Sequence, residues 1–202
     1  MKKQIIVIHG GNTFDTYKQY VSFLKSIEID FEKMTSKGWK DTLEKKLGKG
    51  FEIVLPKMPN AANAKYLEWK IWFEKMISFF ENKVVLVGHS LGGIFLAKYL
   101  SENKFPKKIL ATFLVAAPYK NKNADYSLAD FILKKDLGLL QDQSGKLFIY
   151  QSQDDDVVLF TDFEKYKKAL PNASFKEFKN KGHFNQKNFP EIAREIRKVF
   201  IP

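Results

Sequence analysis

The chain has 202 residues, enough for one domain with a substantial core, and a hydrophobic fraction of 45% excludes an intrinsically disordered protein. It contains no cysteine, which excludes disulfides and any thiolate nucleophile or metal ligand. The net charge of +11 comes from lysines spread along the chain, and Arg194 and Arg197 are its only arginines. Since proteins that read nucleic acids rely on arginine, we expect no specific nucleic-acid partner.

The first apolar run, residues 5–8, is too short for the core of a secretion signal, and His9, Gly10 and Gly11 interrupt it. No window of the sequence approaches the roughly 18 apolar residues that a membrane span needs. The sequence therefore predicts a cytoplasmic protein without a membrane span.

Short apolar runs alternate with amphipathic segments along the chain, a pattern typical of βα units around a parallel sheet. The expected strands are residues 4–8, 51–55, 83–87, 109–115, 146–150 and 174–178. The expected helices are residues 39–47, 65–80, 91–101, 163–170 and 190–200. We therefore expect one domain over residues 1–202, an α/β fold in which a mostly parallel sheet of about six strands forms the middle of a three-layer αβα sandwich.

Two long connections, residues 10–50 and 118–145, should carry further helix, because unstructured loops of that length are uncommon in compact domains. The apolar residues of the stretch 126–140 suit either a lid over a site or a part of the core. For Phe131 and Leu133 the core is the favoured interpretation.

The motif that carries chemistry follows the most apolar expected strand. There the sequence reads Gly88-His89-Ser90-Leu91-Gly92-Gly93, and a helix-like run comes next. G-x-S-x-G between a strand and a helix is typical of a nucleophile elbow, in which a tight turn exposes the serine hydroxyl near a helix N-terminus. The glycines on either side remove side chains that would clash in such a turn. The alternative is a glycine-rich turn that only connects the two elements.

A serine nucleophile needs a base and an acid, which in this arrangement follow it in the order acid, then histidine. His183, just beyond the last expected strand, is the only histidine downstream of Ser90. The acid should follow the preceding strand, where Asp154, Asp155 and Asp156 are adjacent. Because like charges oppose one another's ionisation, we expect one of them to pair with His183 while the others cap a turn or face solvent.

An oxyanion hole requires two backbone N–H groups, for which we predict Leu91, directly after the serine, and Gly11, after the first strand. All these segments follow the carboxyl ends of expected strands, the edge where open α/β sheets collect their sites. No metal or organic cofactor is implied. A nucleotide site at the elbow is less consistent with the sequence, which lacks the Gly-Lys-Ser/Thr of a P-loop.

These residues resemble the small serine hydrolases of the retinoblastoma-binding-protein-9 kind, within the α/β-hydrolase superfamily. The likeness covers nearly the whole chain and includes the segments 9–11, 38–39, 55–59, 88–92 and 182–184, with Trp69 or Trp72 between them. It implies a Ser-Asp-His triad without a large cap domain. In the family the acid is typically followed by the pattern Asp-Pro-x-Val. Alignment of this pattern with the sequence implies that Asp155 is the acid, with Asp156 at the position where proline is common. Because of that departure, Asp154 and Asp156 stay as alternatives.

The leading hypothesis from these residues is hydrolysis of a small carboxylic ester or related acyl compound through Ser90, His183 and Asp155, with an acyl-enzyme intermediate. An aminopeptidase or amidase with the same residues is the second hypothesis. The third is a hydrolase scaffold without activity that serves as a protein-binding module. Residues 13–37 look like a helical insertion relative to shorter relatives, and we expect them either to help form an acyl pocket or to extend the helical layer.

Overall fold

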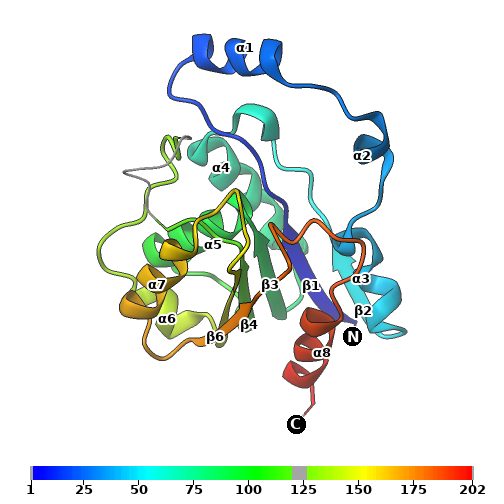
Figure 1. Cartoon of the computed structure of the whole chain (residues 1–202). Coiled ribbons are helices and arrows are strands. Elements are labelled where there is room, and N and C mark those ends of the chain that lie inside the picture. The colour runs from blue at the N-terminus through cyan, green and yellow to red at the C-terminus, as the bar shows by residue number, and fades with distance from the viewer. Residues whose placement is uncertain (1, 120–126, 202) are drawn as a thin grey trace.

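Six parallel strands form one sheet in a computed structural model that describes residues 2–119 and 127–201 (Figure 1). The strands are β1 (Lys3–Ile8), β2 (Phe51–Val54), β3 (Lys83–His89), β4 (Lys108–Val115), β5 (Lys146–Ser152) and β6 (Ser174–Phe178). Their order is β2-β1-β3-β4-β5-β6, and every neighbouring pair is parallel. The six expected strands are confirmed, and their ends differ from the expected ends by no more than two residues.

Helices cover both faces of the sheet. The helices are α1 (Tyr17–Ser26), α2 (Phe31–Thr35), α3 (Trp39–Leu47), α4 (Tyr66–Met76), α5 (Leu91–Glu102), α6 (Gly138–Gln143), α7 (Phe160–Ala169) and α8 (Pro190–Val199). Alternate residues of each strand face opposite sides. Val84 and Leu86 of β3 therefore join the core cluster under α4, α5, α6 and α7, whereas Val85 and Val87 join the cluster under α3 and α8. The predicted three-layer sandwich is confirmed.

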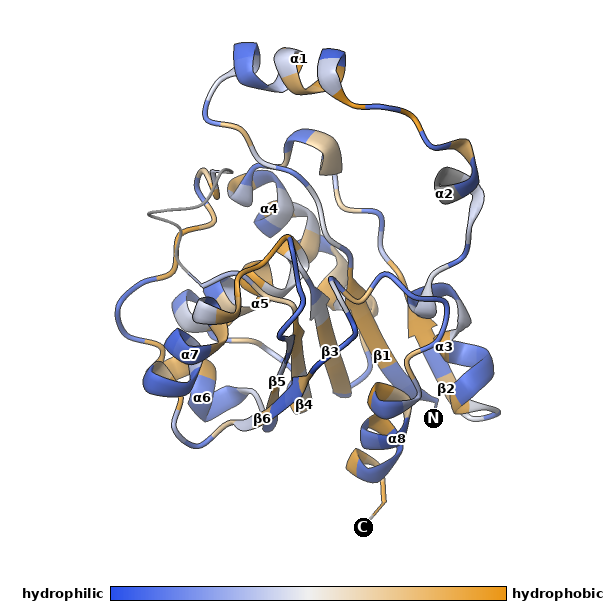
Figure 2. Cartoon of the chain, in the orientation of Figure 1, coloured by the Kyte–Doolittle hydropathy of each residue, from blue (hydrophilic) through white to orange (hydrophobic). Residues whose placement is uncertain are grey.

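The apolar content of the strands explains this burial. Both faces of a parallel sheet are covered, so its strands read as continuous apolar runs rather than alternating ones. Figure 2 shows the hydrophobic colour on β1 and β3, while the helices α3 and α8 are hydrophilic on much of their outer surface. Phe131 and Leu133 are 0% and 7% exposed, so the prediction that they belong to the core is confirmed.

Two helix boundaries differ from the sequence prediction by more than one residue. The α-helix expected over residues 65–80 ends at Met76, and a 3-10 turn (Ile77–Phe79) completes the segment. Helix α7 begins at Phe160, three residues earlier than expected, and its first turn contains Asp162, an acidic residue that suits a helix N-terminus. Neither difference alters the layers of the fold.

The first long connection carries α1, α2 and α3, and the second carries α6, as expected of connections of this length. In Figure 1, α1 lies beyond the carboxyl edge of the sheet, while the N-terminus lies at the opposite edge. Apart from α1, α2 and their loops, the described residues include no large cap domain over that edge. Within residues 2–119 and 127–201, no helix has the length and apolar character required to cross a membrane. Residues 120–126, which include part of the stretch considered as a lid, lie outside the described residues.

Candidate active site

Ser90 stands at the sharp turn between β3 and α5, with backbone angles φ 56° and ψ −123°. A positive φ in a residue other than glycine costs on the order of 1–3 kcal/mol, so the surrounding structure must hold it. A Cβ atom on Gly88 would lie 2.3 Å from the Gly92 carbonyl oxygen, and one on Gly92 would lie 2.3 Å from the carbonyl oxygen of Ile8. The two glycines therefore permit the close packing that this turn requires.

His183 approaches Ser90 from the loop after β6. Its Nε2 atom lies 2.9 Å from Ser90 Oγ, and its Nδ1 atom lies 3.0 Å from each carboxylate oxygen of Asp155. The side chain of His183 is 9% exposed and that of Asp155 is 0% exposed. The structure thus brings these three side chains into one hydrogen-bonded row that is largely shielded from water.

The Asp155 carboxylate is held by the turn that follows β5. Its Oδ1 atom accepts the backbone N–H groups of Val157 and Val158, each at 2.9 Å. Its Oδ2 atom accepts the side-chain amide of Gln151 at 3.0 Å. Asp155 therefore both caps the turn and faces His183. The sequence prediction assigned these two roles to different aspartates. The contribution of Gln151 has no signal in the sequence.

The neighbouring carboxylates have other surroundings. Asp154 is exposed, and its Oδ1 atom accepts the Ser152 hydroxyl at 2.5 Å and the Gly182 N–H at 2.9 Å. These hydrogen bonds, that of Ser152 foremost, hold the pKa of Asp154 below its ordinary value. Asp154 therefore ties the end of β5 to the loop that carries His183. Asp156 is exposed.

The two amides predicted for an oxyanion hole both border the cavity that contains Ser90. Leu91 is the first residue of α5, so its N–H has no partner within the helix. Among the described residues, neither the Leu91 nor the Gly11 N–H donates to a backbone carbonyl. A Cβ atom on Gly10 would lie 3.1 Å from Ser90 Cβ, so the Gly11 loop passes directly beside the serine. In the part of the chain that the structure describes, both N–H groups therefore border the site without a backbone acceptor.

His9 holds the Gly11 loop in place through hydrogen bonds, a role that was not predicted from the sequence. Its Nε2 atom accepts the backbone N–H of Met58 at 2.9 Å, so the Nδ1 atom carries the proton and donates to the Gly10 carbonyl at 2.6 Å. The ring of Trp69 packs edge-to-face with the imidazole, with ring centroids 5.6 Å apart. The position of His9, directly after β1 and before the two glycines, is the available sequence signal.

A cavity of about 850 Å³ extends from Ser90 to helix α1. This volume is within the range of small-molecule sites. Its apolar wall consists of Phe14, Phe23, Leu91, Pro118, Leu128, Val157 and Val158. Its polar wall consists of Asn12, Thr13, Asp15, Thr16, Lys18, Gln19, Ser22 and Ser127, in addition to Gly11 and Ser90. The lining residues from the stretch 13–37 all lie between Thr13 and Phe23.

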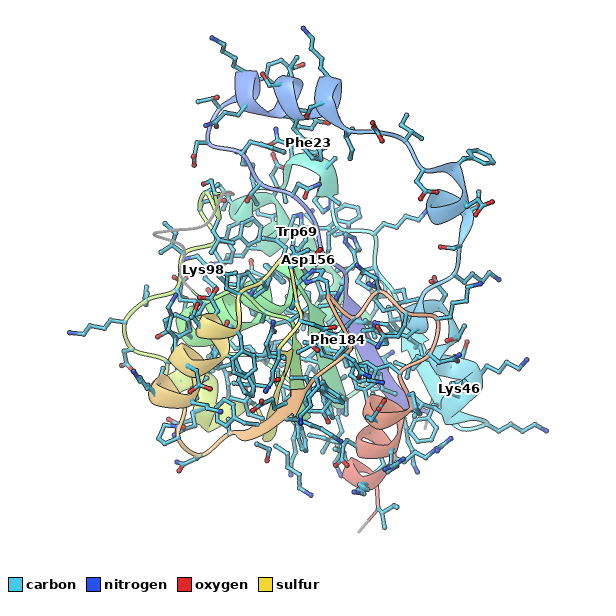
Figure 3. The ribbon with its side chains drawn as sticks, in the orientation of Figure 1. Phe23, Lys46, Trp69, Lys98, Asp156 and Phe184 are labelled. Carbon is cyan, nitrogen blue, oxygen red and sulfur yellow. The ribbon has the colours of Figure 1, made fainter. Side chains whose placement is uncertain are left out.

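Helix α1 packs against Phe14, a residue of the loop that precedes it. The Phe14 ring packs against Tyr20 and Phe23 of α1, with centroids 5.5 and 5.2 Å apart, and Lys65 Nζ donates to the Phe14 carbonyl at 2.8 Å. No residue of α1 is fully buried. Figure 3 shows Phe23 between α1 and the remainder of the protein. The helix therefore covers the cavity without being part of the core.

Comparison with known proteins adds a family and a fold. The model of a family described as serine hydrolase matches residues 31–195. No curated protein sequence matches the chain. The solved structure of the ydeN gene product from B. subtilis is similar with a TM-score of 0.78 and 20% identity, covering 98% of this chain and 99% of that one.

Two further solved structures have the same fold at lower similarity. A putative yden-like hydrolase from Pectobacterium atrosepticum has a TM-score of 0.65 and 15% identity, covering 100% of this chain and 94% of that one. A lipase-esterase related protein from Clostridium acetobutylicum has a TM-score of 0.63 and 13% identity, covering 98% and 94%. At these identities the likeness concerns the fold, which is that of the α/β-hydrolases.

Proposed function

Because this chain belongs to the serine hydrolase family, within the α/β-hydrolase superfamily, we propose that it hydrolyses a small carboxylic ester or a related acyl compound. The observation that carries the proposal is the 2.9 Å contact between His183 Nε2 and Ser90 Oγ, with Asp155 behind the imidazole. A base in hydrogen-bonding contact with a serine hydroxyl is the arrangement that activates it as a nucleophile.

In the first half of the proposed reaction, Ser90 Oγ attacks the carbonyl carbon of the ester while its proton moves to His183 Nε2. The carbonyl oxygen becomes an oxyanion, which the N–H groups of Gly11 and Leu91 stabilise. The carbon–oxygen bond to the alcohol then breaks, and His183 returns the proton to the departing alkoxide. The products of this half are a free alcohol and an acyl group on Ser90.

In the second half, a water molecule takes the place of the alcohol. His183 removes a proton from the water, whose oxygen attacks the acyl carbon, and the same amides stabilise the second oxyanion. The bond to Ser90 Oγ breaks, His183 protonates the serine, and the carboxylic acid leaves. Asp155 accepts a hydrogen bond from the Nδ1–H group throughout, which keeps Nε2 available as a base and stabilises the imidazolium.

We assign the cavity under α1 to the acyl group. Its apolar wall includes Leu91, next to the nucleophile, and Phe23, on the helix. Residues 13–37 are then an insertion that shapes the acyl pocket. The 9–11, 38–39 and 182–184 segments further support placing the chain among the serine hydrolases of the retinoblastoma-binding-protein-9 kind.

Labelling with a fluorophosphonate probe tests the proposal, because this probe reacts with an activated serine without any knowledge of the substrate. The native protein, Ser90→Ala and His183→Ala should be compared, with folding of each checked by circular dichroism. We expect labelling of the native protein alone. A panel of p-nitrophenyl esters and aminoacyl amides then separates ester from amide hydrolysis.

Three results would contradict all or part of the proposal. A folded native protein that does not label lacks an activated serine, and the binding-module hypothesis then takes its place. Labelling that persists in Ser90→Ala places the reactive residue elsewhere. Cleavage of aminoacyl amides in preference to esters would retain the residues and replace the substrate class.

A further inference from the structure

Helix α3 is attached to the loop that carries His183. The backbone N–H of Trp39 donates to the Gln186 carbonyl at 3.0 Å, and its indole N–H donates to the Phe184 carbonyl at 2.8 Å. The hydroxyl of Thr42 donates to the Lys187 carbonyl at 3.0 Å. Three carbonyl groups of the loop are therefore held by the first turn of one helix.

The carbonyl of His183 itself is held through His89. The Nε2 atom of His89 lies 2.8 Å from the His183 carbonyl oxygen, and its Nδ1 atom lies 3.1 Å from Lys40 Nζ. A carbonyl oxygen only accepts, so Nε2 of His89 must carry a proton. A protonated lysine only donates, so Nδ1 must accept. The hydrogen bonds therefore run in one direction, from Lys40 through His89 to His183.

The surroundings of His89 keep its ring neutral. The residue is 3% exposed, and burial, together with the charge of Lys40, lowers its pKa well below the ordinary value. Lys40 is half-buried, and burial lowers its pKa as well, although the charge of Asp41 opposes this. A buried neutral imidazole with both nitrogens paired has one orientation available, because rotation would leave both polar atoms without partners.

We propose that Lys40 and His89 are positioning residues for His183, and this inference rests on the proposed function. His89 directly precedes Ser90, so its hydrogen bond connects the neighbour of the nucleophile to the backbone of the base. The same peptide is also held by the Phe184 N–H, which donates to the Lys181 carbonyl at 2.9 Å. Removing the His89 donor therefore leaves one of its two hydrogen bonds and lets the His183 carbonyl tilt. The imidazole then moves relative to Ser90 Oγ, a displacement that can cost about 100-fold in rate when it reaches about 1 Å.

Four variants test this inference. His89→Leu removes the donor, and His89→Gln keeps a side-chain N–H near the position of Nε2 together with an oxygen that can accept from Lys40. Lys40→Met keeps the aliphatic stem and removes the ammonium. Lys45→Met is the matched control, because Lys45 is an exposed lysine on the same helix.

For each variant we would measure the rate of fluorophosphonate labelling, kcat and KM on one p-nitrophenyl ester, the melting temperature, and the low-field proton resonance of the His183–Asp155 hydrogen bond. We expect His89→Leu and Lys40→Met to slow labelling and lower kcat by about 10- to 100-fold with little change in KM. Both should also shift or broaden the low-field resonance. His89→Gln should restore most of the rate, and Lys45→Met should match the native protein.

Native labelling rates in both His89→Leu and Lys40→Met would overturn the inference. So would a His89→Gln variant as slow as His89→Leu, because the loss would then come from packing rather than from the hydrogen bond. If His89→Leu does not fold, Lys40→Met decides the question. Failure of the native protein to label would instead refute the proposed function, so the two failures are distinct.

Discussion

Both carboxylate oxygens of Asp155 lie 3.0 Å from the Nδ1 atom of His183. Neither neighbouring aspartate has such a contact: Asp154 binds the Ser152 hydroxyl and the Gly182 N–H, and Asp156 is exposed. Three adjacent residues of one type therefore have three different environments. Because their environments differ, the same aspartate-to-asparagine substitution at Asp155 and at a neighbour tests which residue is the acid.

We predict that Asp155→Asn lowers kcat/KM by about 10³- to 10⁴-fold, since an amide removes the charge that stabilises the imidazolium and favours the wrong histidine tautomer. Asp156→Asn should retain nearly native activity. Steady-state hydrolysis of a p-nitrophenyl ester measures both. A large loss in Asp156→Asn with an active Asp155→Asn would transfer the role to the neighbour.

Gly11→Ala should lower kcat by about 100- to 1,000-fold, the usual effect of losing one oxyanion donor. The added Cβ would lie 2.6 Å from the Ala61 carbonyl oxygen, so the loop must shift and carry the N–H away from the site. Gly38→Ala is a suitable control, because its Cβ would make only an ordinary contact, 3.8 Å from Asp41. Equal activity of Gly11→Ala and Gly38→Ala would show that the Gly11 amide does not contribute.

The fold could be predicted from the sequence because its signals are local. Apolar runs such as residues 84–87 identify buried strands, and the glycines around Ser90 are required by the turn itself. The position of α1 could not be predicted. No residue of that helix is fully buried, so its place depends on contacts made after folding, such as those of Phe14, rather than on its own pattern.

The site was predictable only where chain order restricts the candidates. His183 is the sole histidine after Ser90 in the sequence. By contrast, nothing in the sequence shows that Asp155 is buried and its two neighbours are not. The catalytic roles of His183 and Asp155 stay predictions. Lys40 carries no sequence signal, because its partner His89 lies 49 residues away and the contact exists only after folding.

Tyr99 should make the protein sensitive to alkaline pH. Burial, with a contribution from Glu74, raises the pKa of its hydroxyl from 10.0 to about 12. The folded state therefore keeps this proton where the unfolded state releases it, so the stabilisation is complete below pH 10 and is lost as the pH rises toward 12. Urea denaturation of native protein and Tyr99→Phe between pH 8 and 11 measures the effect. The variant should lose less stability above pH 10, and parallel curves would contradict the assignment.

Phe23→Ala should change the preferred acyl chain length. Phe23 lines the cavity from α1, and its truncation adds space at the end far from Ser90. We therefore expect kcat/KM for an octanoyl or decanoyl p-nitrophenyl ester to rise relative to the butyryl ester by about tenfold, a typical effect of one or two methylene groups in an apolar pocket.

Leu24→Ala is the control, because Leu24 is 47% exposed and does not border the cavity. If both variants show the native chain-length profile, the acyl group binds elsewhere and α1 only covers the site. If both change equally, the helix affects access to the cavity rather than its depth.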